Sequence, residues 1–220
     1  MILLLFGPPG CGKGTQAALL SERLSIPAIS TGDMFRAECR AGTDLGRIAC
    51  ELLSRGAFVS DDIVNRVVAR RIAQPDCKDG FLLDGYPRTV PQAAAFSSLA
   101  RERGLPEPAV IHLDVPDELV SMRLCARRHC TECSRVYNLV TQPPRVAGVC
   151  DADGAPLTAR EDDRDKVIRD RVRTYHRQTG PVLRWYNSAR VRRVDGTMSP
   201  DQVARAVSSA VIEGSRAIGA

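Results

Sequence analysis

The residues with the clearest chemical potential lie near the start of the chain, in the segment GPPGCGKGT at positions 7–15. An uninterrupted apolar run, residues 1–6, precedes this segment, and residues 16–20 read as helix. Glycines let consecutive backbone N–H groups converge on an anion, and the N-terminus of the following helix adds a partial positive charge. This order predicts a phosphate-binding loop in which Lys13 reaches the outer phosphates. The alternative is a glycine-rich turn that contains a lysine by chance.

The loop departs from the usual phosphate-loop motif at one position. Gly7, Gly12 and Lys13 have the motif's spacing, but Gly14 stands where the motif has serine or threonine. Thr15 follows one place later. Because a buried strand precedes the loop and a helix follows it, the segment still favours phosphate binding over a chance turn.

A carboxylate is expected close to this loop. Residues 81–84, FLLD, read as a second buried strand that ends in Asp84. Ligands of open α/β sheets bind at the carboxyl ends of the strands, and a carboxylate there commonly supports Mg²⁺, directly or through water. The alternative for Asp84 is a strand-end residue that caps a turn.

Apolar runs that read as strands alternate with helical patterns along the rest of the chain. Such alternation predicts an α/β fold with a parallel sheet flanked by helices, like that of the P-loop NTPases. The expected strands are residues 1–6, 25–30, 81–84, 109–114 and 191–194. The expected later helices are 34–40, 45–55, 63–73, 91–102, 117–128, 162–187 and 200–213. Residues 129–159, with scattered Pro and Gly, are expected to form a small insert.

Composition narrows the class of protein. The 220 residues suffice for one sizeable domain, and no apolar run approaches the roughly 20 residues that span a membrane. The short N-terminal apolar run lacks a preceding basic segment, so we expect a cytoplasmic protein. With a net charge of +5 and 5% aromatic residues, nucleic-acid binding and membrane binding are not expected. Only three of the 31 basic residues are lysines, and arginines suit bidentate phosphate binding, although a GC-rich genome would also produce them.

Cysteine usage separates into two groups. Eight cysteines without a secretory signal argue against a disulfide framework, so the scattered ones are expected to be free: Cys11, Cys39, Cys50, Cys77 and Cys125. The clustered ones form the pattern Cys130-x2-Cys133, sixteen residues, Cys150-x2-Asp153. Three thiolates and a carboxylate can close a tetrahedral structural zinc site.

The metal prediction has open alternatives. Asp151 or His129 competes with Asp153 for the fourth place, and iron or cobalt could replace zinc. A reduced, metal-free insert held by hydrogen bonds is the other possibility. A bound metal is expected to hold the shape of the insert and to take no part in chemistry.

Several segments together resemble the adenylate kinases. GPPGCGKGT resembles the family's phosphate loop, residues 30–36 (STGDMFR) resemble STGDMLR, and residues 84–89 (DGYPRT) resemble DGFPRT. Residues 115–119 (VPDEL), 157–163 (LTAREDD, against LTxRxDD) and 195–197 (DGT) also match, in the same order, from residue 1 to about 200. The cysteine pattern resembles the zinc-bearing lid of many bacterial adenylate kinases.

The resemblance implies an AMP site. Thr31 and Arg36 would contact AMP, Arg88 would grip its phosphate, and Gln92 would read the adenine edge. The implied AMP-binding residues are Thr31, Arg36, Ala57, Phe58, Val59, Gly85, Tyr86, Pro87, Arg88, Gln92, Arg160 and Arg171.

The resemblance also implies an ATP site. Arg123 and Arg127, four residues apart in the expected helix 117–128, would share one face, the first near the adenine and the second on phosphate. Arg160 and Arg171 would converge on the transferring phosphate, and the backbone at 195–198 would abut the adenine. The implied ATP-binding residues are Gly10, Cys11, Gly12, Lys13, Gly14, Thr15, Arg123, Arg127, Val136, Tyr137 and Met198.

The implied activity is reversible, Mg²⁺-dependent phosphoryl transfer from ATP to AMP, giving two ADP, in a monomer with an AMP-binding region (residues 30–59), a lid (126–163) and a core (1–29, 60–125 and 164–220). Such transfer needs in-line positioning and positive charge. The residues expected to act in it are Lys13, Asp84, Arg88, Arg127, Arg160 and Arg171. A UMP/CMP kinase is one rival, although Thr31 and Gln92 favour AMP. A nucleotide or metal sensor without turnover is the other.

Overall fold

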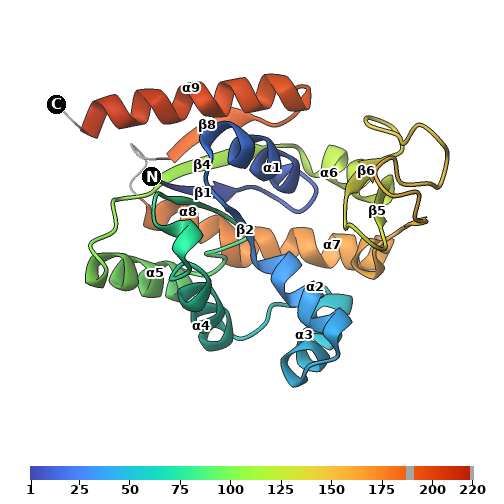
Figure 1. Ribbon diagram of the computed structural model, residues 1–220, viewed down its shortest axis with the longest axis horizontal. Coiled ribbons are helices and arrows are strands. Elements are labelled where there is room, and N and C mark those ends of the chain that lie inside the picture. Colours follow the sequence, from blue (N-terminus) through green and yellow to red (C-terminus); the bar gives the residue numbers. More distant parts are fainter. Residues whose placement is uncertain (187–190, 219–220) are drawn as a thin grey trace.

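The computed structural model describes residues 1–186 and 191–218, with side chains through residue 211. Its centre is a parallel sheet of five strands in the order β2-β3-β1-β4-β8, with helices on both faces (Figure 1). The strands are β1 (Ile2–Phe6), β2 (Ala28–Ser30), β3 (Phe81–Asp84), β4 (Ala109–Asp114) and β8 (Val191–Asp195). The predicted α/β fold class and its expected strands are confirmed.

The central strand β1 explains the two-sided core. Alternate side chains of a strand point to opposite faces of the sheet. Ile2, Leu4 and Phe6 pack with residues of α4, α5 and α8. Leu3 and Leu5 pack with residues of α1 and α9 on the other face. An uninterrupted apolar run is therefore what this position in the sheet requires.

The helices connect the strands and extend beyond them. Seven α-helices precede the C-terminal pair: α1 (Lys13–Leu24), α2 (Thr31–Ala41), α3 (Asp44–Ser54), α4 (Asp61–Arg71), α5 (Val90–Glu102), α6 (Asp117–Cys125) and α7 (Asp165–Thr174). The last two are α8 (Gly180–Trp185) and α9 (Pro200–Ile218). Short turns η1 (Pro75–Cys77) and η2 (Glu161–Asp163) are 3₁₀ helices, and η3 (Tyr175–Thr179) is a π-helical turn.

Two expected helices differ from the structure. The helix expected over 117–128 ends at Cys125, because residues 127–130 instead pair with neighbouring strands as β5 (Arg127–Cys130). The prediction that Arg123 and Arg127 share a helix face is therefore wrong. The helix expected over 162–187 is divided into η2, α7, η3 and α8, and its last residue lies outside the described residues. Pro181 lacks the N–H that a continuous helix needs, and the π turn precedes it.

The lid forms a separate small sheet beside the core. Its strands, in the order β6-β5-β7, are antiparallel, with β6 at Val136–Asn138 and β7 at Leu157–Thr158. Figure 1 shows the lid and the pair α2 and α3 as two projections from the same side of the sheet layer.

One cysteine prediction is wrong. Cys39 and Cys50 form a disulfide that joins α2 to α3, with their Cα atoms 5.6 Å apart. The two helices approach closely at Gly46, where an added Cβ would lie 2.1 Å from the carbonyl oxygen of Glu38. Cys11, Cys77 and Cys125 are free, as expected. In the described part of the chain, no helix has both the length and the apolarity to span a membrane.

Candidate active site and metal centre

The phosphate loop joins β1 to α1. Gly10 and Gly12 have positive φ angles of 81° and 101°, which a side chain would disfavour, so the glycines allow the turn that aims backbone groups inward. The Lys13 ammonium donates to the carbonyl oxygens of Gly7 at 2.8 Å and Pro8 at 2.9 Å. Lys13 thus lies inside the loop, where an anion would also lie. Cys11 is buried, whereas Gly14 is exposed at the start of α1.

The sheet register brings Asp84 to the same place. Asp84 at the end of β3 pairs with Leu5, one residue before β1 ends. A Cβ added at Gly14 would lie 3.7 Å from Asp84 Oδ2, so the carboxylate faces the start of α1. Burial raises the pKa of the Asp84 carboxyl above its ordinary value, and the nearby Lys13 and Arg88 oppose that change. A carboxylate in this position suits Mg²⁺, which prefers oxygen ligands.

A pocket lies between α2, α3, α4 and the loop that follows β3. Most of the predicted AMP-binding residues line it, namely Thr31, Ala57, Phe58, Val59, Gly85, Arg88 and Gln92. Gly32, Phe35, Leu53 and Val64 also line it, although the sequence reasoning assigned them no role. Tyr86 and Pro87 are buried behind the pocket, and the Tyr86 hydroxyl donates to Asn65 Oδ1 at 2.8 Å. Arg36 lies nearby and donates through Nε to Asp33 Oδ1 at 3.2 Å.

Arg88 is the charged residue of this pocket. Its Nε donates to the Gly85 carbonyl at 2.7 Å, and its guanidinium carbon lies 5.0 Å from the centre of the Phe58 ring. Burial lowers the pKa of Arg88 to about 10, and Asp84 opposes that change. Arg88 therefore remains a cation at neutral pH although it is half-buried. A half-buried cation without a hydrogen-bonded carboxylate is prepared for an anionic ligand.

Arg160, which follows β7 of the lid, also lacks a hydrogen-bonded carboxylate in the described structure. Its side chain is 11% exposed, and the nearest carboxylate oxygen, Asp33 Oδ1, is 3.9 Å away. Its Nε is buried without a hydrogen-bond partner in the described structure. Burial and, to a lesser extent, Arg127 lower the pKa of Arg160 to about 10.

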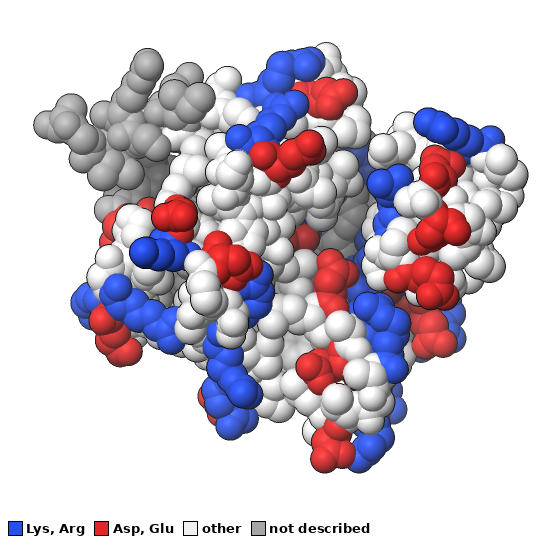
Figure 2. All heavy atoms as spheres, in the orientation of Figure 1, with Lys and Arg blue, Asp and Glu red and all other residues white. Residues whose placement is uncertain are grey.

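Asp162 and Asp163 hold Arg127 and Arg171 in place, although no role was predicted for either carboxylate from the sequence. Arg127 binds Asp163 through two hydrogen bonds of 2.7 and 2.6 Å. Arg171 contacts Asp162 Oδ2 and Asp163 Oδ1, both at 3.0 Å. Asp163 is 2% exposed and Asp162 13%, so these pairs are shielded from solvent. Figure 2 shows the hollow between the lid and the rest of the molecule, with basic and acidic side chains at its edge.

The predicted ATP-binding residues lie in the phosphate loop, in α6, in the lid and in the segment that follows β8. Arg123 donates to the carbonyl oxygens of Gly196 at 2.9 Å and Cys11 at 3.5 Å, which links the phosphate loop to the segment that contains Met198. Met198 is half-buried against the core. Val136 is exposed on β6. The neighbouring Tyr137 side chain is buried among lid cysteines, so any contact of this residue with ATP would come from its backbone.

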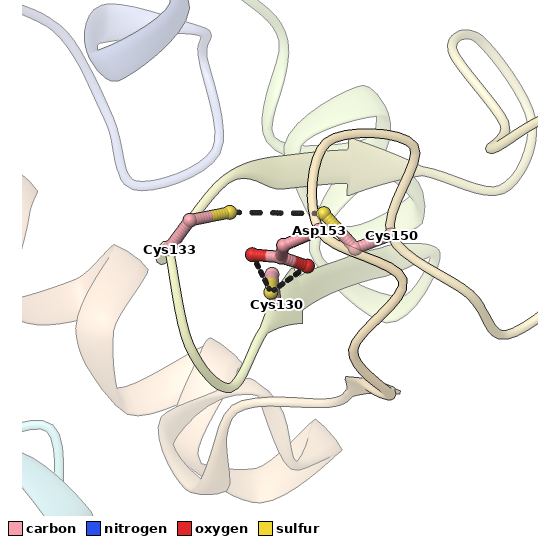
Figure 3. A group of neighbouring side chains, drawn as sticks. All are labelled: Cys130, Cys133, Cys150 and Asp153. Atoms are coloured by element: carbon pink, nitrogen blue, oxygen red, sulfur yellow. Dashed lines mark hydrogen bonds between the residues drawn. The ribbon is translucent and has the colours of Figure 1, made fainter.

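The lid cysteines converge with Asp153. The ligand atoms of Cys130, Cys133, Cys150 and Asp153 all lie within 4.8 Å of one another (Figure 3). Cys133 Sγ is 3.6 Å from Cys150 Sγ, and Cys130 Sγ is 3.3 Å from Asp153 Oδ2. Ligands of a tetrahedral zinc ion with Zn–S bonds of about 2.3 Å are separated by about 3.8 Å. The donor set and its spacing therefore fit a tetrahedral metal ion.

The two alternative fourth ligands lie elsewhere. His129 Nδ1 is 3.0 Å from the Thr158 carbonyl oxygen, and Asp151 Oδ1 accepts from the Arg145 N–H at 2.9 Å. Asp153 raises the pKa of the Cys133 thiol to about 12. Metal binding would have to displace this proton, so it would be coupled to proton release.

Comparison with known proteins identifies the family. A family model described as adenylate kinase matches residues 5–191.

The chain belongs to the adenylate kinase family.

Adenylate kinase of Symbiobacterium thermophilum is 48% identical over 212 residues, covering 96% of this chain and 98% of that protein. Adenylate kinase of Thermosipho melanesiensis is 46% identical, with 94% and 97% covered. Adenylate kinase of Trichlorobacter lovleyi is 47% identical, with 97% and 100% covered. The chain is thus an enzyme of the nucleoside monophosphate kinase class, a phosphotransferase. The predicted family and enzyme class are confirmed.

Proposed function

We propose that the chain catalyses reversible transfer of the γ-phosphoryl group from Mg²⁺-bound ATP to AMP, giving two ADP, and so serves adenine nucleotide homeostasis. The observation that carries this proposal is the pair Arg88 and Arg160, two half-buried cations that have no hydrogen-bonded carboxylate in the described structure. Transfer between two phosphates needs positive charge on both sides of the reacting group. The pocket that contains Arg88 would place positive charge on one side, and the loop that contains Lys13 would place it on the other.

The proposed roles follow from position. Lys13 and the backbone of residues 10–15 would bind the ATP phosphates, while Arg88 and Arg36 would hold the AMP phosphate. Arg127, Arg160 and Arg171 would surround the transferring group, and Asp162 and Asp163 would keep two of these arginines oriented before substrate binds. Arg123 and Met198 would lie beside the ATP base. Closure of the lid would exclude water, which would otherwise accept the phosphoryl group.

Magnesium would bind with ATP near Asp84. The ion would neutralise charge on the phosphate oxygens, and Asp84 would hold it directly or through water. In the protein itself, the carboxylate's position beside Gly14 and Lys13 supports this role.

We further propose a structural zinc ion in the lid, held by Cys130, Cys133, Cys150 and Asp153. The spacing of these four ligand atoms supports it. Iron or cobalt would suit the same donors. The boundaries of the AMP-binding region (30–59) and the lid (126–163), a monomeric state, a cytoplasmic location and the absence of nucleic-acid or membrane binding stay predictions.

A substrate panel tests the proposed function. ADP formation from Mg²⁺-bound ATP is measured with AMP, UMP, CMP and GMP as separate acceptors. We expect turnover with AMP and little with the others, because Thr31 and Gln92 line an acceptor pocket that suits adenine.

If a pyrimidine nucleotide is the acceptor that turns over, the proposed phosphoryl-transfer mechanism would stand, but the proposed acceptor, AMP, would be wrong. Folded protein that binds ATP but turns over no acceptor would favour the sensor without enzymatic activity.

A further inference from the structure

Asp61, at the start of α4, contacts Gln92 in the first turn of α5 and Thr89, the N-cap residue of that helix. Its Oδ1 accepts a hydrogen bond from Gln92 Nε2 at 2.7 Å, and its Oδ2 accepts one from Thr89 Oγ1 at 2.9 Å. Thr89 Oγ1 in turn accepts from the Gln92 backbone N–H at 3.2 Å. Asp61 is not among the site residues predicted from the sequence.

The Gln92 amide is bound at both ends. Its Oε1 accepts from the backbone N–H of Arg88 at 2.8 Å, while its Nε2 donates to Asp61. The two ends of a glutamine amide have nearly the same shape, so hydrogen-bond partners decide the orientation. A carboxylate can only accept and a backbone N–H can only donate. Asp61 and Arg88 therefore permit one orientation and oppose the flipped one.

This orientation leaves a defined pair of groups for a ligand. An amide has two N–H donors and two acceptor positions, and the described protein partners of Gln92 use one of each. Gln92 is 1% exposed and lines the acceptor pocket. The remaining donor and acceptor match adenine, whose edge presents an acceptor at N1 and a donor at N6. Hypoxanthine has the opposite pattern, with a donor at N1 and an acceptor at position 6.

We propose that Asp61 is a specificity-determining positioning residue, which fixes the Gln92 amide so that the acceptor pocket selects adenine over a 6-oxopurine. This inference rests on the proposed function, because it assumes that the pocket receives AMP. Asp61 acts through Gln92 and need not touch the substrate. Its carboxylate is aimed at Gln92 and Thr89, whereas the adjacent Asp62 is exposed on the same first turn of α4.

The test compares AMP and inosine monophosphate (IMP) as acceptors, with Mg²⁺-bound ATP as donor, in the full-length enzyme. The variants are Asp61→Ala, Asp61→Asn and the control Asp62→Ala, which removes the same charge from the same helix turn. For Asp61→Ala we expect the ratio of kcat/KM for AMP to that for IMP to fall about tenfold or more. Most of the loss with AMP should be in KM, and kcat should be largely kept.

Asp61→Asn should keep the wild-type ratio, because the carboxamide oxygen still accepts from Gln92 while its N–H₂ can donate to Thr89. Asp62→Ala should also keep it. If Asp61→Ala does not fold, Asp61→Ser replaces it, since its hydroxyl lies one bond nearer the backbone and does not reach Gln92.

An unchanged AMP-to-IMP ratio in Asp61→Ala or Asp61→Ser would overturn the inference. If kcat/KM fell equally with both acceptors, the ratio would be unchanged and Asp61 would have only a structural role. Loss of the ratio in Asp62→Ala would also contradict it. A wild-type enzyme that does not use AMP at all would instead contradict the proposed function, so the two failures are distinguishable.

Discussion

Arg88→Ala is expected to lower kcat by about 10³- to 10⁵-fold while the protein keeps its fold, by analogy with the arginines that stabilise charge in other phosphoryl transfers. Arg88 is the charged residue of the acceptor pocket, and its guanidinium is already oriented by contacts with Gly85 and Phe58. Alanine removes both the positive charge and the N–H donors of the guanidinium. The measurement is steady-state ADP formation at saturating ATP and AMP, with circular dichroism to verify folding.

Arg101→Ala is the matched control, because Arg101 is an exposed arginine on α5, away from the pocket. It should have wild-type turnover. Lys13→Ala should show a loss comparable to that of Arg88→Ala, because the Lys13 ammonium lies inside the phosphate loop. Near-normal activity in Arg88→Ala or Lys13→Ala would remove that residue from the proposed mechanism.

The sheet was predictable from the sequence because its strands are buried on both faces. A strand such as β1 must then be apolar throughout, and short apolar runs separated by helical patterns indicate parallel order. The phosphate loop was predictable for a similar local reason, since its glycines and Lys13 are adjacent in sequence. The cysteine cluster of the lid was predictable for the same reason, because its residues occur in two short motifs with regular spacing.

Features that depend on contacts between distant segments were missed. Arg127 begins a strand because residues 127–130 pair with residues 136–138 and 157–158. The local sequence pattern, which reads as helix, does not indicate that pairing. The disulfide between Cys39 and Cys50 depends on how the chain turns back at Gly42 and Thr43, so that α2 and α3 approach closely at Gly46.

The same reason applies to the carboxylates of the site. Asp162 and Asp163 follow Arg160 in the segment LTAREDD (residues 157–163). Their partners, Arg127 and Arg171, are distant in sequence, and only the folded structure brings them into contact with these carboxylates. The contact of Asp61 with Gln92 joins two helices whose first residues are far apart in the chain. Sequence patterns predicted which residues would bind, and the structure adds which residues hold those side chains in place.

Removal of metal from the lid is expected to lower the thermal midpoint of unfolding by about 10 °C. A ligand present at a thousand times its Kd stabilises the folded state by about 4 kcal/mol, and each kcal/mol corresponds to roughly 2–4 °C in a domain of this size. A bound metal would join the segment of Cys130 and Cys133 to that of Cys150 and Asp153, whose ligand atoms lie close together. The measurements are metal content per chain and thermal unfolding before and after chelation.

Single substitutions separate the metal from general effects on the lid. Asp153→Ala and Cys130→Ala should lose bound metal and the associated stability, whereas Asp151→Ala and Cys125→Ser should retain both, because neither residue belongs to the cluster. Metal loss in Asp151→Ala with retention in Asp153→Ala would replace the fourth ligand. Because the cluster is built only from lid residues, turnover measured well below the unfolding midpoint should survive chelation when Mg²⁺ is restored. A metal-free protein as isolated, or turnover that stops at low temperature without the lid metal, would contradict a purely structural metal.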